Sequence, residues 1–196
     1  MKIFNTLILI TISLCAGLCC PPEEEYDYQS IEIKNNNLVQ IENDKTTFQL
    51  NDTIYVNTII DNNQITVDNK NIILSDFLNL DTDPYLYFNL TLYKKTRFGT
   101  LSKIAVTNSN IVVLNGLAKN SYDEIIEVKN EYDSVNFTSK FGIKLLESGT
   151  YYLAPPNFDY SEYLYINGIS RDYDQITIFS KIKKSEDTGA YKFFVE

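Results

Sequence analysis

The 196-residue sequence contains no histidine and no tryptophan, and its three cysteines all lie within the first 20 residues. Without histidine the chain has no imidazole general base, no Ser-His-Asp or Cys-His arrangement and no histidine metal ligand. Because no cysteine follows residue 20, a domain after that point has no disulfide bridges and depends on its hydrophobic core. Glycine-rich phosphate-binding motifs are absent as well. The sequence therefore predicts no metal site and no cofactor.

Basic residues are also few. Lys and Arg total 17 against 26 Asp and Glu, which gives a formal net charge of −9 at pH 7. This balance predicts no nucleic-acid partner, because binding nucleic acid needs a basic face. Paired carboxyl groups, as in glycosidases, are the remaining catalytic option, but nothing marks two of the acids as a buried pair. Asp is common in turns, so we predict no enzymatic activity.

The N-terminus has the three parts of a secretory signal. Met1 and Lys2 form a charged start, residues 3–14 are almost wholly apolar, and small residues and cysteines follow before Pro21. A transmembrane helix needs about 20 apolar residues, and this run is shorter. We therefore predict a signal peptide over residues 1–18 and export of the remainder.

Residues 14–19 (LCAGLC) resemble the lipobox of bacterial lipoproteins, in which cleavage precedes a cysteine that is then acylated. The resemblance is confined to the signal, and with the overall composition it implies a lipoprotein of the Bacteroidota type. It implies a palmitate-bearing membrane anchor at Cys19, with Cys20 and Cys15 as alternatives. The acidic run at 23–25 resembles a signal for the outer membrane or cell surface. Ordinary cleavage would instead yield a secreted or periplasmic protein.

Residues 19–36 are predicted to be a flexible tether, because prolines, acids and three consecutive asparagines offer little to bury. An edge strand at 30–34 remains an alternative. Residues 37–196 are predicted to form one domain, since that length suffices for a single core.

Alternation of apolar and polar residues recurs throughout this domain. The stretch 53–60 places Ile54, Val56 and Ile60 on one face. The stretch 85–93 has inward Leu86, Phe88, Leu90 and Leu92 and outward Tyr85, Tyr87, Asn89, Thr91 and Tyr93. Further strands are predicted at 103–107, 111–114, 125–128, 135–146, 151–154, 162–166, 175–182 and 190–195. The fold class is all-β, a single antiparallel β-sandwich, immunoglobulin-like or related, with few or no helices after the signal.

Two stretches also carry helical signals. Residues 75–80 would form one turn capped by Ser75. Residues 121–132 begin with a capping-box spacing, Ser121 to Glu124, but their β-branched residues favour a strand.

An acid-x-Gly-x-Tyr-x-apolar pattern occurs twice, at 147–153 and at 187–193. It resembles the tyrosine-corner turn of immunoglobulin-like sandwiches. The resemblance implies that the hydroxyl groups of Tyr151 and Tyr191 bond back to the backbone.

Aromatic residues, 15 Tyr and 11 Phe, provide the main binding hypothesis. A ligand platform would use Tyr85, Tyr87 and Tyr93, or a cluster that contains Tyr151, Tyr160 and Tyr163, with exposed rings stacking on sugars. Tyrosines on sheets also serve cross-strand packing. We therefore expect a structural or interaction role at the cell envelope, and alternatively a glycan- or peptide-binding accessory module for uptake or adhesion.

Overall fold

The computed structural model describes residues 30–122, 124–156, 158, 161–169 and 175–196. Within these residues the regular secondary structure is almost entirely strand, with one short α-helix, α2 (Leu74–Phe77), and two 3-10 turns, η1 (Glu42–Asp44) and η2 (Asn108–Asn110). The predicted all-β, sandwich-like fold class is confirmed. The predicted signal peptide, the three cysteines and the first part of the tether lie outside the described residues.

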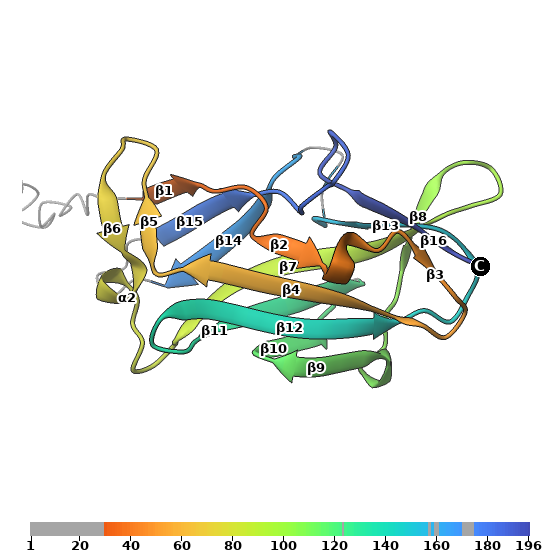
Figure 1. Ribbon diagram of the computed structural model, residues 1–196, viewed down its shortest axis with the longest axis horizontal. Helices are drawn as coiled ribbons and strands as arrows, with labels where there is room; N and C mark the ends of the chain where they lie inside the picture. Colours follow the sequence, from red (N-terminus) through yellow and green to blue (C-terminus); the bar gives the residue numbers. More distant parts are fainter. Residues whose placement is uncertain (1–29, 123, 157, 159–160, 170–174) are drawn as a thin grey trace, which may run out of the picture.

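The strands follow one another along the chain as short segments separated by turns (Figure 1). They are β1 (Ile31–Lys34), β2 (Val39–Ile41), β3 (Thr47–Phe48), β4 (Thr53–Asp61), β5 (Asn63–Ile65), β6 (Asn71–Ile73), β7 (Tyr85–Lys95), β8 (Leu101–Ile104), β9 (Ile111–Asn115), β10 (Leu117–Asn120), β11 (Ile125–Tyr132), β12 (Asn136–Lys144), β13 (Gly149–Ala154), β14 (Leu164–Ile169), β15 (Gln175–Ser180) and β16 (Tyr191–Val195).

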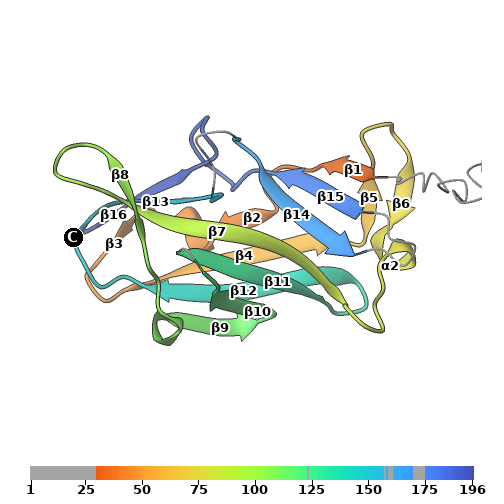
Figure 2. The same ribbon diagram turned by 180° about the vertical axis from the view of Figure 1, so that it is seen from behind.

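Most of the described strands belong to one large sheet that curls upon itself (Figures 1 and 2). Its main path runs β1-β15-β14-β7-β11-β12-β4-β2, and β5 pairs with β6 in a separate small sheet. The curl brings β2, at one end of this path, beside the residues after β15, where Val39 bridges Ile182 and accepts a hydrogen bond from the Lys183 amide at 2.8 Å. The curled sheet thus forms two facing layers, and the apolar sides of these layers enclose the main core.

Alternation sets which side chains enter this core. In β4, Ile54, Val56 and Ile60 are buried as predicted, because successive side chains of a strand point to opposite faces. The first half of β7 follows the same rule, with Leu86 and Phe88 inside.

The second half of β7 departs from the prediction, since Thr91 and Tyr93 are buried although we expected them to face outward. The chain that follows β13 covers this part of the outer face. The Tyr93 hydroxyl donates a hydrogen bond to the Pro156 carbonyl oxygen at 2.7 Å, and its ring packs edge-on against Phe158.

The ambiguous stretches are resolved by their surroundings. Residues 125–132 form strand β11, which pairs with β7 along seven positions, so tertiary pairing outweighs the helical capping signal. One helical turn forms as α2, close to the predicted position.

Two sheet contacts are parallel, β1 with β15 and β3 with β16, whereas the other named strand pairs of the described chain are antiparallel. Strand β1 occupies residues within the predicted tether, so the edge-strand alternative holds there. Its Ile33 is fully buried, which gives this segment an apolar reason to join the sheet.

The two tyrosine motifs have different hydrogen bonds. The Tyr151 hydroxyl donates to the Glu147 carbonyl oxygen at 2.9 Å, which confirms the predicted bond to backbone. The Tyr191 hydroxyl instead donates to the Lys45 carbonyl oxygen at 3.2 Å. Both hydroxyl groups therefore bond to backbone as predicted, and the second tyrosine connects distant parts of the chain.

Candidate functional site

The outer face of one layer brings together side chains from six strands that are far apart in sequence. Strands β1, β15, β14, β7 and β11 lie side by side on this layer (Figure 2), and β10 pairs with β11 beyond them. The pairing registers place one outward residue of each strand in a single cross-strand row, namely Glu32, Thr177, Asn167, Tyr87, Lys129 and Leu117. This row runs across a mixed polar and aromatic surface, which we call the tyrosine face.

The first aromatic group of the tyrosine face is on β7. Tyr85 and Tyr87 are half-buried, and the Lys129 ammonium lies 5.3 and 5.1 Å from their ring centroids. Attraction between an ammonium and an aromatic face fixes the orientation of these rings. The Tyr87 hydroxyl donates a hydrogen bond to the Asp83 carboxylate. Both rings are thus held in place before any ligand arrives.

The second aromatic group surrounds Phe179 of β15. Tyr163 and Tyr165 pack edge-on against Phe179, with ring centroids 6.3 and 5.4 Å away. The ammonium groups of Lys34 and Lys181 lie 5.0 and 5.2 Å from the Tyr163 centroid. Edge-to-face geometry of this kind is favourable for aromatic pairs.

An ion pair borders this second group. Lys181 donates to the Glu162 carboxylate at 2.6 Å, and this contact lowers the pKa of Glu162 and raises the pKa of Lys181. Both side chains therefore remain charged at neutral pH. The pair limits where the aromatic group is open to a ligand.

Amide and hydroxyl groups lie between the two aromatic groups. The Asn167 side-chain oxygen accepts hydrogen bonds from the Thr177 hydroxyl at 3.0 Å and from the Gln175 amide at 3.3 Å. Such groups hydrogen-bond to ligand hydroxyls, while the adjoining rings offer apolar surface.

The structure separates the predicted platform residues. Tyr85, Tyr87 and Tyr163 share the tyrosine face, whereas Tyr93 and Tyr151 are only 6% and 4% exposed. The Tyr151 ring stacks on Phe193 at 5.5 Å within the core. Neither buried ring is available for stacking on a ligand, so those two candidates are corrected. Tyr160 lies outside the described residues.

Sequence reasoning missed Phe179, Lys129 and Lys34 as members of this face. Period-two alternation does place Phe179 opposite the buried Ile178. It does not reveal that β15 and β14 lie next to β7, because strand order depends on long-range pairing. Alternation could therefore have predicted that the Phe179 ring points outward, but not that it lies near the tyrosines of β7 and β14.

Several carboxyl groups of the described residues accept hydrogen bonds from lysines or backbone amides. Each described carboxyl group whose pKa is displaced has it lowered, as at Asp44 by a hydrogen bond from Lys184 and at Asp133 by the backbone amide of Asn136. Among the described residues, no three His, Cys, Asp or Glu side chains gather in a way that would hold a metal ion.

A polar hollow of about 270 Å³ lies on another side, beside η1. Its charges pair with one another. Lys140 contacts Glu42 at 2.6 Å, and Asp44 contacts Lys184 at 3.0 Å and Lys183 at 3.6 Å. Exposed pairs of this kind contribute little to stability and present no unpaired charge to a ligand. We therefore place the candidate site on the tyrosine face.

Comparison with known proteins assigns no family to the chain. No family model matches the sequence, and no curated protein matches it. Among solved structures, the crystal structure of the human F-spondin reeler domain aligns with a TM-score of 0.40 and 10% sequence identity. That alignment covers 90% of this chain and 100% of the reeler domain chain. A likeness at this level carries no argument about function. In the part of the chain that the structure describes, no helix is long and apolar enough to span a membrane.

Proposed function

We propose that this protein is an exported, non-enzymatic interaction protein of the cell envelope, anchored by lipid at Cys19. The proposal for export and anchoring rests on the apolar N-terminal run and the cysteine that ends it.

The observation that carries the interaction role is the cross-strand row of the tyrosine face. It gathers Tyr85 and Tyr87 on the same surface as Tyr163, although these residues come from different parts of the sequence. The rings are oriented by Lys129 and Lys181 and flanked by the Asn167 amide. Preoriented side chains lose less entropy on binding, which favours recognition over a merely structural role.

The ligand class that this surface suits best is a glycan. Flat aromatic faces beside amide and hydroxyl groups match the alternating apolar and hydroxylated faces of sugars. An extended peptide is the alternative, since tyrosine surfaces also bind protein ligands.

A glycan array tests this proposal. We expect the protein to retain a set of related glycans, and we expect Tyr87→Ala and Tyr163→Ala each to abolish that retention. Tyr55→Ala is the matched control, because Tyr55 lies on the outer side of β4, away from the tyrosine face. A blank array, or equal loss in the Tyr55 variant, would exclude glycan recognition by this face.

The anchor is tested separately by palmitate labelling in the native host. Cys19→Ala is expected to abolish labelling and membrane retention, while Cys15→Ala and Cys20→Ala keep both. If labelling persists in Cys19→Ala, the acylated residue is Cys15 or Cys20. Absence of labelling in the unchanged protein would contradict the lipid anchor.

A further inference from the structure

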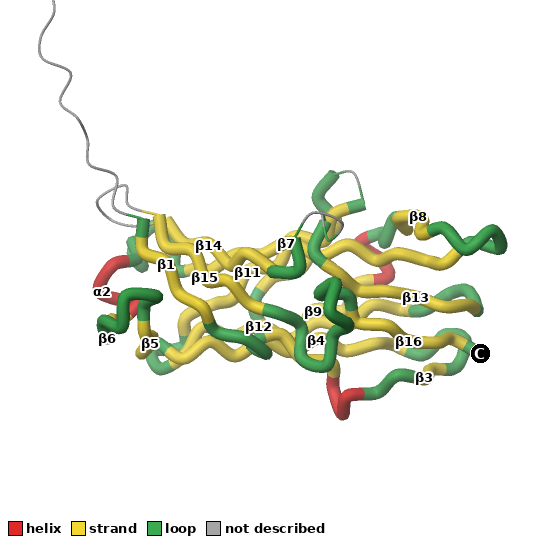
Figure 3. The backbone as a smooth tube through the Cα atoms, turned by 90° about the horizontal axis from the view of Figure 1, so that it is seen from above, coloured by secondary structure: helices red, strands yellow, loops and turns green. Residues whose placement is uncertain are grey.

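Exposed apolar side chains gather at the end of the molecule where the described chain begins. Strands β5 and β6, helix α2 and the C-terminal end of β14 share this end, and the C-terminus of the chain lies at the opposite end (Figures 1 and 3). The exposed residues there are Ile65, Val67, Ile73, Phe77 and Ile169. We call this set the apolar end.

The apolar end is rigidly built. In the β5–β6 hairpin Asn63 pairs with Ile73 and Ile65 pairs with Asn71, while Gln64 between them is buried. Because alternate residues face opposite ways, burial of Gln64 holds Ile65 outward.

Asn62 fixes the helix to this hairpin. Its side-chain oxygen accepts a hydrogen bond from the Ser75 amide at 2.9 Å, and its amide group donates to the Ser75 hydroxyl at 2.9 Å and to the Tyr132 hydroxyl at 3.1 Å. The exposed Phe77 of α2 is thereby kept beside the hairpin.

The apolar surface continues to the point where the described chain begins. A hollow of about 330 Å³ has an apolar part formed by Ile31, Val67, Ile72 and Phe77. Its other lining residues are Ser30, Glu32, Thr66, Asp68 and Lys70. Ser30 is the first described residue. The same end therefore holds both the exposed apolar side chains and the junction with the N-terminal segment.

The length of that segment points to the partner. Cys19 precedes Ser30 by eleven residues. Even a fully extended chain of that length spans only about 40 Å, so an anchored protein holds this end within about 40 Å of the bilayer. Single exposed apolar side chains are common on protein surfaces and need no explanation. A cluster of them indicates a contact surface, and at the tethered end of an anchored protein the nearby apolar partner is the bilayer.

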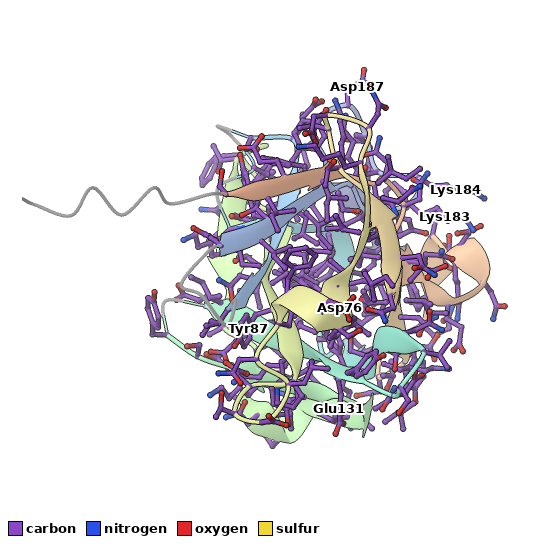
Figure 4. The ribbon with its side chains drawn as sticks, turned by 90° about the vertical axis from the view of Figure 1, so that its left-hand side faces the viewer. Asp76, Tyr87, Glu131, Lys183, Lys184 and Asp187 are labelled. Atoms are coloured by element: carbon purple, nitrogen blue, oxygen red, sulfur yellow. The ribbon has the colours of Figure 1, made fainter. Side chains whose placement is uncertain are left out.

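The charges at this end indicate the kind of lipid. Asp68 pairs with Lys70 at 2.7 Å, so their charges offset each other. Glu32, which lines the hollow, and Asp76, which stands on α2 at the front of this end (Figure 4), add negative charge. No basic excess is present here among the described residues to attract anionic headgroups. A zwitterionic surface is compatible with this arrangement.

We propose that the apolar end contacts the surface of the zwitterionic bilayer that carries the anchor, with Ile65 and Val67 at the boundary between the headgroups and the acyl chains. This proposal rests on the lipid anchor at Cys19. Together with the tether, this contact fixes the orientation of the domain, so that its opposite end points away from the membrane.

The absence of tryptophan from the chain allows a sharp test. The full acylated protein is reconstituted into phosphatidylcholine vesicles with brominated acyl chains, which quench nearby indole fluorescence. Ile65→Trp and Val67→Trp place the probe at the apolar end. Phe98→Trp is the control, because Phe98 is 78% exposed in the β7–β8 connection at the opposite end (Figure 1).

We expect a blue shift and a marked loss of fluorescence for Ile65→Trp and Val67→Trp, with Phe98→Trp unchanged. Equal quenching at both ends, or no quenching at Ile65, overturns the proposal. A blue-shifted but unquenched indole at Ile65 also overturns it, since the chain's own tether then covers the patch.

Mass spectrometry of the purified protein distinguishes failure of the lipid anchor from failure of the membrane contact. An unacylated protein defeats the anchor and this contact together, whereas an acylated protein with an unquenched indole defeats the contact alone.

Discussion

The Ser139 hydroxyl donates a hydrogen bond to the side-chain oxygen of Asn130 at 2.8 Å inside the core. The Asn130 amide in turn donates to the Leu86 carbonyl oxygen at 2.9 Å. These bonds connect β12, β11 and β7. Strands β11 and β12 pair directly only near the turn that joins them. Beyond that point β11 pairs with β10 and β12 pairs with β9, so the two strands diverge. The Asn130 and Ser139 side chains lie where this divergence begins. A polar contact thus joins strands that lack ladder hydrogen bonds there.

Removal of this buried amide should be costly. Asn130→Ala leaves the Leu86 carbonyl and the Ser139 hydroxyl without their partner, and we expect a loss of about 1–3 kcal/mol in the free energy of unfolding. Ser139→Ala removes one bond of the same set, so the double variant should cost less than the sum of the two. Urea unfolding followed by circular dichroism measures these values. Asn89→Ala, at an exposed position of β7, is the control. Strictly additive losses would show that the two side chains act independently.

Removal of either motif tyrosine's hydroxyl should lower the free energy of unfolding by a similar amount, although the two hydroxyl groups have different partners. Tyr151→Phe removes the bond to Glu147 and Tyr191→Phe removes the bond to Lys45, and each should cost about 0.5–1.5 kcal/mol because both rings are buried. Tyr122→Phe should be neutral, since Tyr122 is exposed. The same denaturation experiment applies. A neutral Tyr191→Phe would contradict the long-range bond to Lys45.

Gly189 is expected to tolerate no side chain. Its φ is +80°, and a Cβ atom there would collide with the backbone carbonyl oxygen of Glu162. Gly99 has a similar φ of +87° but open space around it. Gly99→Ala should therefore cost only the conformational penalty of about 1–2 kcal/mol, and Gly189→Ala should cost clearly more. Melting temperatures of both variants provide the comparison, and equal values would argue against the collision.

Stability should fall in acid and change little between pH 5 and 8. Hydrogen bonds from the backbone amides of Asn136 and Val135 lower the pKa of Asp133, and the backbone amide of Gln49 together with Lys45 lowers the pKa of Asp52. A carboxyl group whose pKa is lower in the folded state stabilises the fold above its ordinary value near 3.8. That contribution disappears as the pH falls through the lowered value.

Melting temperatures between pH 8 and pH 2 measure this dependence. The chain has no histidine that would titrate between pH 5 and 8. Asp133→Asn should lower the melting temperature at pH 7 and match the unchanged protein at the acid end, where Asp133 is protonated. A constant difference across the whole range would mean that the charge of Asp133 plays no part.

Local sequence patterns were sufficient to predict the kind of structure. Alternation identified β4 and the first half of β7, and the acid-x-Gly-x-Tyr spacing predicted the Tyr151 bond, because these features depend on residues only a few positions apart. The outward orientation of Tyr85 and Tyr87 followed from the same period.

Alternation cannot decide whether the outer side of a strand meets solvent or another segment. The outer side of Tyr93 meets the chain after β13, whereas Tyr87 stays half-exposed and no described segment covers it, although both belong to β7 and obey one period. Long-range pairing also decided that Phe179 and Asn167 share a face with Tyr87. The sequence by itself thus determined the strands and their inner faces. Only the tertiary structure decided which outer faces are open and which residues meet there, since strand order is set by the packing of the whole core.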